Sequence, residues 1–234
     1  MSDWKAKRFW KTATAEPVAD GFSVFLDGRP IRTPAKSALI LPTIGYANLV
    51  ASEWQAQTEI VNPDTMPATR TANAAIDKVA VQKAEVAEML AAYGDADLLC
   101  YRANSPAELV TIQAAAWDPY LEWAALELGA QLSVRQGVMH QPQHPDAIAN
   151  LTKRVHALSV FELAAFHDMV SLTGSLVLGF ASSLNFRPPN SVWDASRVDE
   201  IWQEQQWGQD DEATAMANRK KSAFLHAVSV FHLS

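Results

Sequence analysis

The hydrophobic residues of this chain change their spacing near residue 43, and this change constrains the fold more than any other feature. Before it, apolar and polar residues alternate in short runs, as in half-buried strands. The run GFSVFLDGRPIRT places Asp27 and Gly28 between two such runs, which predicts a two-residue β-hairpin turn. Pro30 has no backbone N–H, so we expect the second strand to lie at a sheet edge. Further short strands are expected over RFWKTA and SALILP.

After residue 43 the apolar residues recur at helical spacing. Thr43 is expected to cap a helix whose buried residues are Ile44, Ala47, Ala51 and Trp54. A proline-bounded loop is expected over residues 61–67. A longer helix is then predicted to end at Gly94, with one apolar stripe formed by Ala72, Ile76, Val79, Val86, Leu90 and Tyr93.

Three later helix starts have the capping-box pattern, in which a hydroxyl and a carboxylate three residues later satisfy free N–H groups. The three pairs are Ser105 with Glu108, Ser159 with Glu162, and Ser191 with Asp194. The helix after Ser105 is expected to kink or restart at Pro119, because proline removes a helical N–H. The most apolar window, 169–184, is shorter than a bilayer span and is interrupted by serines and glycines. We interpret it as a buried helix in which small residues at helical spacing let a second helix approach closely: Ser171, Ser175, Gly179 and Ser182. Close packing is expected at Gly174 as well.

These patterns predict an α+β protein with two domains. A small N-terminal antiparallel β domain with one connecting helix is expected over residues 1–60, followed by a larger all-α domain over residues 61–234. A chain of 234 residues is long enough to bury a core in each.

The charge is distributed unevenly along the chain. The net charge of −7 argues against a protein that binds nucleic acid electrostatically. Residues 1–42 hold seven bases and four acids, so the remaining residues carry −10. The segment KRFWK, together with Trp4 and Lys5 just before it, mixes aromatic and basic residues, which leaves membrane-surface binding open. A strand that buries one aromatic side chain is favoured. No apolar signal segment opens the sequence, and Cys100 is the single cysteine, so we expect a leaderless cytosolic protein without disulfides.

Sequence motifs for enzymatic chemistry are missing. The chain has no glycine-rich phosphate-binding motif and no G-x-S-x-G. Ser175 lies in an apolar run, where we expect its hydroxyl to bond a preceding carbonyl. His140 and His144 flank Pro142, which predicts a surface loop and not a zinc site. The many carboxylates leave a carboxylate-based hydrolase open as the alternative function.

The stretch DEIWQEQQWGQDDEA, residues 199–213, surrounds Trp202 and Trp207 with acids. Its six carboxylates are Asp199, Glu200, Glu204, Asp210, Asp211 and Glu212. If the segment after Ser191 forms a single helix, its acidic residues and one arginine lie on the side opposite the apolar residues. One interpretation is an amphipathic helix with a solvated face and Trp202 in the core. The other is a recognition surface with an exposed tryptophan, since Trp193 and Trp207 fall off the apolar stripe.

Several motifs in order resemble one protein family. The runs RFWK, LDGRPIRTPAKSALILPT, EWQAQ, MPATRTANAAID, YGDADLLCYRA, WDPYLEW and DEIWQEQQWG together resemble the F1-ATPase assembly-chaperone family dedicated to the alpha subunit. The resemblance covers residues 8–213, and its specificity comes from the order and spacing of the runs.

The resemblance implies a chaperone that has no enzymatic activity and acts independently of nucleotide. Neither a cofactor nor a metal is expected. The resemblance also implies that the chain holds the free F1-ATPase alpha subunit in solution until a beta subunit replaces the chaperone, in the bacterial cytoplasm or, for a eukaryotic source, the mitochondrial matrix. Stable membrane insertion and nucleic-acid binding are not expected. The family's functional acidic position falls in the D-E-x-W-Q motif, which assigns partner binding to Glu200 first and Asp199 second. The predicted set is completed by Trp202, Gln203, Trp207 and Asp210.

Overall fold

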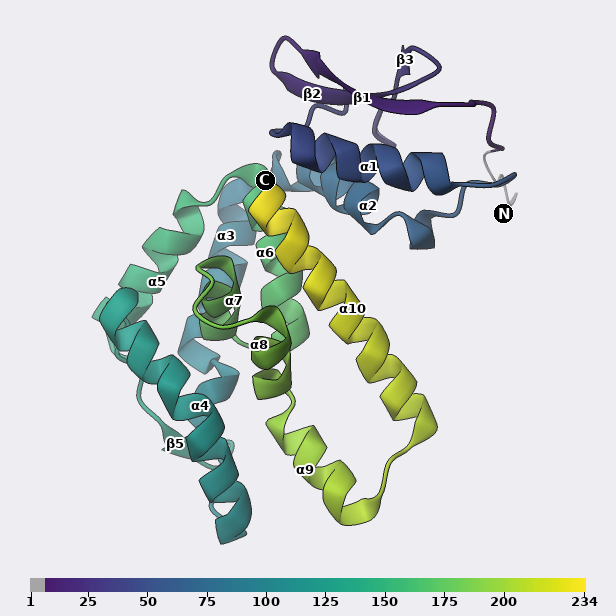
Figure 1. The fold of residues 1–234 in the computed structure, drawn as a ribbon. Coiled ribbons are helices and arrows are strands. Elements are labelled where there is room, and N and C mark those ends of the chain that lie inside the picture. Colours follow the sequence, from purple (N-terminus) through teal and green to yellow (C-terminus); the bar gives the residue numbers. More distant parts are fainter. Residues whose placement is uncertain (1–6) are drawn as a thin grey trace. The chain divides into compact units, whose positions relative to one another are not determined.

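The computed structural model describes residues 7–234 (Figure 1). A small antiparallel sheet near the N-terminus is followed by a mostly helical region, so the predicted α+β class is confirmed. Two compact units are present. The first holds the described residues up to Lys83 with Ser159–Ala165 and Ser229–Ser234, and the second holds Ala84–Leu158 and Phe166–Val228. The expected domain boundary after residue 60 stays a prediction.

The sheet of the first unit has the order β1-β2-β3, with β1 at Ala13–Val18, β2 at Gly21–Leu26 and β3 at Arg29–Pro30. The predicted hairpin turn is confirmed: Asp27 and Gly28 have φ values of 47° and 80°, as a type I′ turn requires. Pro30 lies in the edge strand β3, as expected.

The predictions of further strands over RFWKTA and SALILP are wrong. RFWKTA enters β1 only at Ala13, because the Arg8 guanidinium occupies nearby backbone carbonyls, donating to Trp10 O at 3.0 Å and Lys11 O at 3.2 Å. SALILP joins the sheet through isolated bridges, such as that between Phe22 and Leu41. Of the aromatic residues in the basic segment, Trp10 is buried and Phe9 is exposed. Trp4 and Lys5 lie outside the described residues.

The helix α1 (Ile44–Ala56) packs against β1 and β2. Thr43 caps it as predicted, since its hydroxyl accepts the Tyr46 N–H at 3.1 Å. Ala47 and Ala51 are buried and Trp54 is partly buried, but Ile44, at the first helical position, is exposed. The core of this unit is formed by Val24, Leu26, Leu39, Leu41, Tyr46, Val50, Ala68, Ala165 and Val230.

The long helix predicted to end at Gly94 is broken into shorter elements. They are α2 (Pro67–Ala74), a π turn at Ala75–Val79, α3 (Lys83–Ala91) and a 3-10 turn at Ala92–Ala96. The loop expected before the predicted helix, over residues 61–67, contains a 3-10 turn at Pro63–Thr65. The wider π turn interrupts the 3.6-residue period that the prediction assumed. Gly94 lies buried inside the last turn, where a Cβ atom would come within 3.0 Å of Leu151.

The second unit is mostly helical. Its remaining elements are a 3-10 turn at Leu98–Cys100, β4 (Tyr101–Arg102), α4 (Ala107–Glu127), β5 (Arg135–Gln136), α5 (Pro145–Ala157), α6 (Val160–Thr173), α7 (Leu176–Ser183), α8 (Pro189–Ser196), α9 (Val198–Trp207) and α10 (Asp211–Leu233). Both α6 and α10 extend into the first unit. β4 and β5 form a short parallel pair.

One of the three capping boxes is confirmed. At the start of α6, the Ser159 N–H donates to Glu162 at 2.7 Å, and the Glu162 N–H donates to the Ser159 hydroxyl at 3.1 Å. The box at Ser105 is wrong because α4 begins only at Ala107. The box at Ser191 is wrong because α8 already starts at Pro189, a favourable first helical residue. The helix α4 contains Pro119 and does not restart there.

The apolar window 169–184 is mostly buried, as expected, but it forms two helices. Gly174, with φ of 70°, separates α6 from α7, and all eight residues of α7 are buried. Ser175 does not bond a preceding carbonyl: its hydroxyl accepts the Leu178 N–H at 3.0 Å and donates to Asp97 at 2.8 Å. No helix within residues 7–234 has the length and apolar character to cross a membrane.

Candidate functional site

The single helix expected after Ser191 is divided into α8 and α9, and the acidic stretch begins on α9. The chain turns at Arg197, between α8 and α9. Trp193 is therefore buried on α8, and its expected place off the apolar side is wrong. The indole N–H of Trp117 on α4 donates to the Ala195 carbonyl at 2.7 Å, which fixes the end of α8. The position of α9 is thus set by the buried interior of the second unit.

Asp199 and Glu200 are adjacent on α9, but they have different partners. Asp199 accepts a 2.6 Å hydrogen bond from the side-chain amide of Gln113, a buried residue of α4. Glu200 forms an ion pair with Arg197 at 2.9 Å, and Glu204 lies 3.8 Å from the same guanidinium. Asp199 therefore holds α9 against α4, whereas Glu200 and Glu204 form a row around one mostly buried arginine.

The two tryptophans of α9 differ in exposure. Trp202 is partly buried, so its predicted place in the core is only partly reached. Trp207 is 77% exposed and meets the edge of Trp202 at 6.2 Å between ring centroids. Gln203 is also exposed on this helix. The predicted exposed tryptophan is therefore present, beside the acidic row.

Asp210 belongs to the turn that joins α9 to α10. Gly208 adopts φ of 91° there, and the Asp210 carboxylate accepts the Ala213 N–H at 2.7 Å, which caps the start of α10. Asp210 thus has a local structural role, and one of its carboxylate oxygens remains open to other partners.

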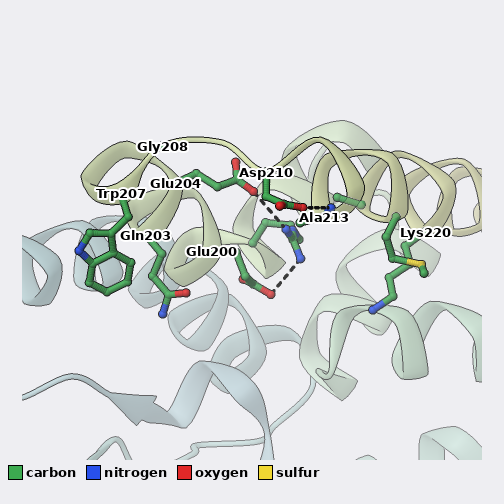
Figure 2. A pocket seen from close by; sticks show the side chains of 11 residues that line it. Glu200, Gln203, Glu204, Trp207, Gly208, Asp210, Ala213 and Lys220 are labelled. Carbon is green, nitrogen blue, oxygen red and sulfur yellow. Dashed lines mark hydrogen bonds and ion pairs between the residues drawn. The ribbon is translucent and has the colours of Figure 1, made fainter.

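Between α9 and α10 lies a groove of about 400 Å³ (Figure 2). Glu200, Gln203, Glu204 and Trp207 line its α9 side, and Ala213, Met216, Ala217 and Lys220 line its α10 side. The residues on α10 were not predicted. Their spacing of three or four residues places them on one face of α10, but this spacing does not indicate that the face lines a groove with α9.

A second hollow, of about 450 Å³, adjoins the groove. The two have Arg197, Glu200, Gln203 and Lys220 in common. The second hollow continues to the junction of α6 and α7 at residues 171–174, and to Trp117 and Trp193. The acidic row of α9 is therefore part of a longer depression in the surface of the second unit.

The groups with possible chemistry elsewhere do not converge. His140 contacts Asp95 at 3.2 Å, while the His144 ring accepts the Asp146 N–H at the start of α5. Among the described residues, no cluster of three or more His, Cys, Asp or Glu side chains could hold a metal ion. Cys100 is buried, and burial raises the pKa of its thiol to about 12, so its thiolate is rare at neutral pH.

Comparisons with known proteins point to one family. The model of the ATP12 chaperone protein family matches residues 7–125. The crystal structure of Atp12 from Paracoccus denitrificans, 44% identical, covers 99% of both chains with a TM-score of 0.95. A lysine-for-aspartate mutant of Atp12p from the same organism matches equally well. The protein atp12, mitochondrial, of Schizosaccharomyces pombe is 26% identical over 225 residues, which are 91% of this chain and 77% of that protein.

Proposed function

Because this chain belongs to the ATP12 chaperone protein family, we propose that it binds the unassembled alpha subunit of F1-ATPase, prevents its aggregation and hands it to the beta subunit. A subunit made for a ring of alternating partners exposes a large surface before assembly, and such surfaces aggregate. The chaperone covers that surface by binding and releases it to the beta subunit. It makes and breaks no covalent bonds in this role and needs no cofactor.

The observation that carries the proposal is the exposed Trp207 beside the acidic row of α9. Tryptophan side chains are frequent anchors in protein interfaces, and a ring of charges around an anchor gives specificity and a fast association. A chaperone must also release its client, which favours a few anchors with a polar rim over a large dry interface. The surface of α9 suits this requirement.

We assign different roles to the two acids of the D-E-x-W-Q motif. Glu200, in the groove wall, contacts basic groups of the client, and the resemblance to the family favours it as the first candidate. Asp199 accepts from the buried Gln113 and positions α9. Trp202 and Gln203 of the motif, with Trp207 and Asp210, complete the proposed client surface.

No observation favours the alternative of a carboxylate-based hydrolase. Such an enzyme needs two carboxylates that face each other across a substrate. In this site Asp199 binds an amide, Glu200 an arginine and Asp210 a backbone N–H. We further propose the bacterial cytoplasm as the location, supported by the 44% identity to the Paracoccus denitrificans protein.

Aggregation of the isolated alpha subunit tests the proposed function. We expect light scattering by dilute alpha subunit to fall when the protein is added at equal concentration, without ATP. Addition of beta subunit should then release the client, detected as loss of the chaperone–alpha complex in size-exclusion chromatography. Unchanged scattering at several-fold excess of the protein would refute the proposal.

A further inference from the structure

We propose that the groove between α9 and α10 binds one segment of the client in which an aliphatic side chain lies next to an arginine or lysine. This inference rests on the proposed function and specifies the client's contact. It adds a second wall, formed by Ala213, Met216, Ala217 and Lys220 of α10, to the surface of α9.

The two walls of the groove have different chemistry. The α9 wall presents carboxylates and the indole of Trp207, and the α10 wall presents the apolar side chains of Ala213, Met216 and Ala217. These three residues follow helical spacing, so they form one continuous strip along α10. A segment between the walls would therefore meet charge on one side and apolar surface on the other.

The apolar strip is left open in the structure. Met216 is 47% exposed and Trp207 is 77% exposed, although both line the groove. Every residue of α10 from Asp211 to Lys220 is exposed or partly buried. Covering these two side chains with an aliphatic group would remove apolar surface from water, which is favourable by roughly 25 cal/mol per Å².

The charges along the groove give the bound segment a direction. In Figure 2, Trp207 lies at one end and Lys220 at the other, with Glu204 and Asp210 between them. Glu200 is already held by Arg197 at 2.9 Å, whereas Glu204 is 3.8 Å from that guanidinium. Glu200 uses only one carboxylate oxygen for Arg197. Like Glu204 and Asp210, it therefore has an oxygen available for an incoming cation, and the face of Trp207 would favour the same cation.

Lys220 lies at the opposite end of the groove. Within residues 7–234 it has no ion-pair partner, and it also lines the adjoining hollow. A basic side chain of the client would be repelled there, so the cation of the segment is expected near Trp207 and a polar or acidic group near Lys220. A nucleic-acid strand does not suit the groove, because its phosphates would face three carboxylates.

The test compares two methionines that are equally exposed on different helices. Met216 lines the groove, while Met89 of α3 is 48% exposed outside it. We expect Met216→Asp to weaken binding of the isolated alpha subunit at least about tenfold, a loss typical of an interface anchor. Met89→Asp should change the affinity less than about twofold. Melting temperatures of both variants control for folding.

A photo-crosslinking amino acid at position 216 identifies the occupant directly. After crosslinking to alpha subunit, mass spectrometry should find one alpha-subunit peptide containing an aliphatic residue beside an arginine or lysine. The same group at position 89 should give no such peptide. Crosslinks to an acidic peptide, or to a second copy of this chain, would overturn the inference.

Two outcomes separate the inference from the proposed function. If the unmodified protein does not bind alpha subunit at all, the proposed function fails. If it binds but Met216→Asp and Met89→Asp bind equally well, the groove is not the contact, while the chaperone function stands.

Discussion

At the scale of single residues, Asp97 is a fully buried carboxylate that joins distant parts of the second unit. It accepts hydrogen bonds from the Ser175 hydroxyl at 2.8 Å and from the Val177 and Leu99 N–H groups at 3.0 Å each. These bonds tie the turn at Leu98–Cys100 to the start of α7. Burial outweighs them and raises the pKa of Asp97 to about 6, from an ordinary value of 3.8.

The raised pKa predicts a pH dependence of stability with a definite sign. The stability that protonated Asp97 contributes to the folded protein is fully present below the pKa of this residue in the unfolded chain. It is lost as the pH rises through about 6, because the Asp97 carboxyl ionises less readily in the folded protein. At about 1.36 kcal/mol per pKa unit, the loss is on the order of 3 kcal/mol. Denaturant titrations at pH 4 and pH 7 should show this difference for the protein and lack it for Asp97→Asn. Identical pH profiles for both would contradict the prediction.

Charge reversal at Glu200 should affect binding far more than folding. Its ion pair with Arg197 is partly exposed, and such pairs contribute about 1 kcal/mol or less. We expect Glu200→Lys to change the melting temperature by only a few degrees and to abolish stable binding of the alpha subunit. Glu85→Lys, at an exposed position on α3, is the matched control and should bind normally. A large decrease in the melting temperature of Glu200→Lys would instead show that Glu200 is needed for folding, and would contradict the prediction.

At the scale of elements, two glycines at α6 and α7 are required for different reasons. A Cβ atom at Gly179 would lie 2.8 Å from Val170 and 3.1 Å from Phe166, so α7 approaches α6 closely there. At Gly174 there is space, with the nearest atom at 4.0 Å, but φ of 70° disfavours other residues. The expected close approach is thus found at Gly179 and is wrong at Gly174.

Alanine substitutions separate the two effects. Gly179→Ala should destabilise by about 1–3 kcal/mol, since the added methyl overpacks a buried contact. Gly174→Ala should cost about 1–2 kcal/mol through backbone strain alone. Gly174→Leu should destabilise the protein by about as much as Gly174→Ala, because there is space around a Cβ atom at this position. Gly179→Leu should unfold the second unit. Urea titrations of the four variants measure these changes in the free energy of unfolding. Equal losses for Gly174→Leu and Gly179→Leu would contradict the proposed difference between the two positions.

The elements that the sequence predicts well are those fixed by neighbouring residues. The turn at Asp27 and Gly28, the Thr43 cap and the Ser159 box each depend on contacts within a few positions. The breaks at Gly174 and Arg197 could not be predicted in the same way. Ser175 caps α7 while bound to Asp97, a partner 78 residues away, and tertiary contacts of this kind leave no local pattern.

At the scale of the whole molecule, the same limit applies to the candidate site. The acidic stretch and its exposed Trp207 follow from composition and order alone, and the family resemblance points to Glu200. The opposite wall on α10 could not be predicted, because no local signal says that Met216 and Lys220 line one groove with α9. The hydrogen bond between Asp199 and the buried Gln113 could not be predicted either, because the two residues are 86 positions apart in the sequence.

The charge distribution predicts how client binding depends on salt. The net charge of −7 and the three carboxylates of the groove should attract basic groups of the client over distance and speed association. The screening length falls from about 10 Å at 0.1 M to about 3 Å at 1 M salt, so this attraction is lost at high ionic strength. In surface plasmon resonance with immobilised alpha subunit, the association rate should fall on the order of tenfold between 0.05 and 0.5 M NaCl. The dissociation rate, set by the apolar contacts of Trp207 and Met216, should change much less. Glu204→Gln should show a shallower salt dependence of association, and an association rate independent of salt would refute electrostatic attraction by this surface.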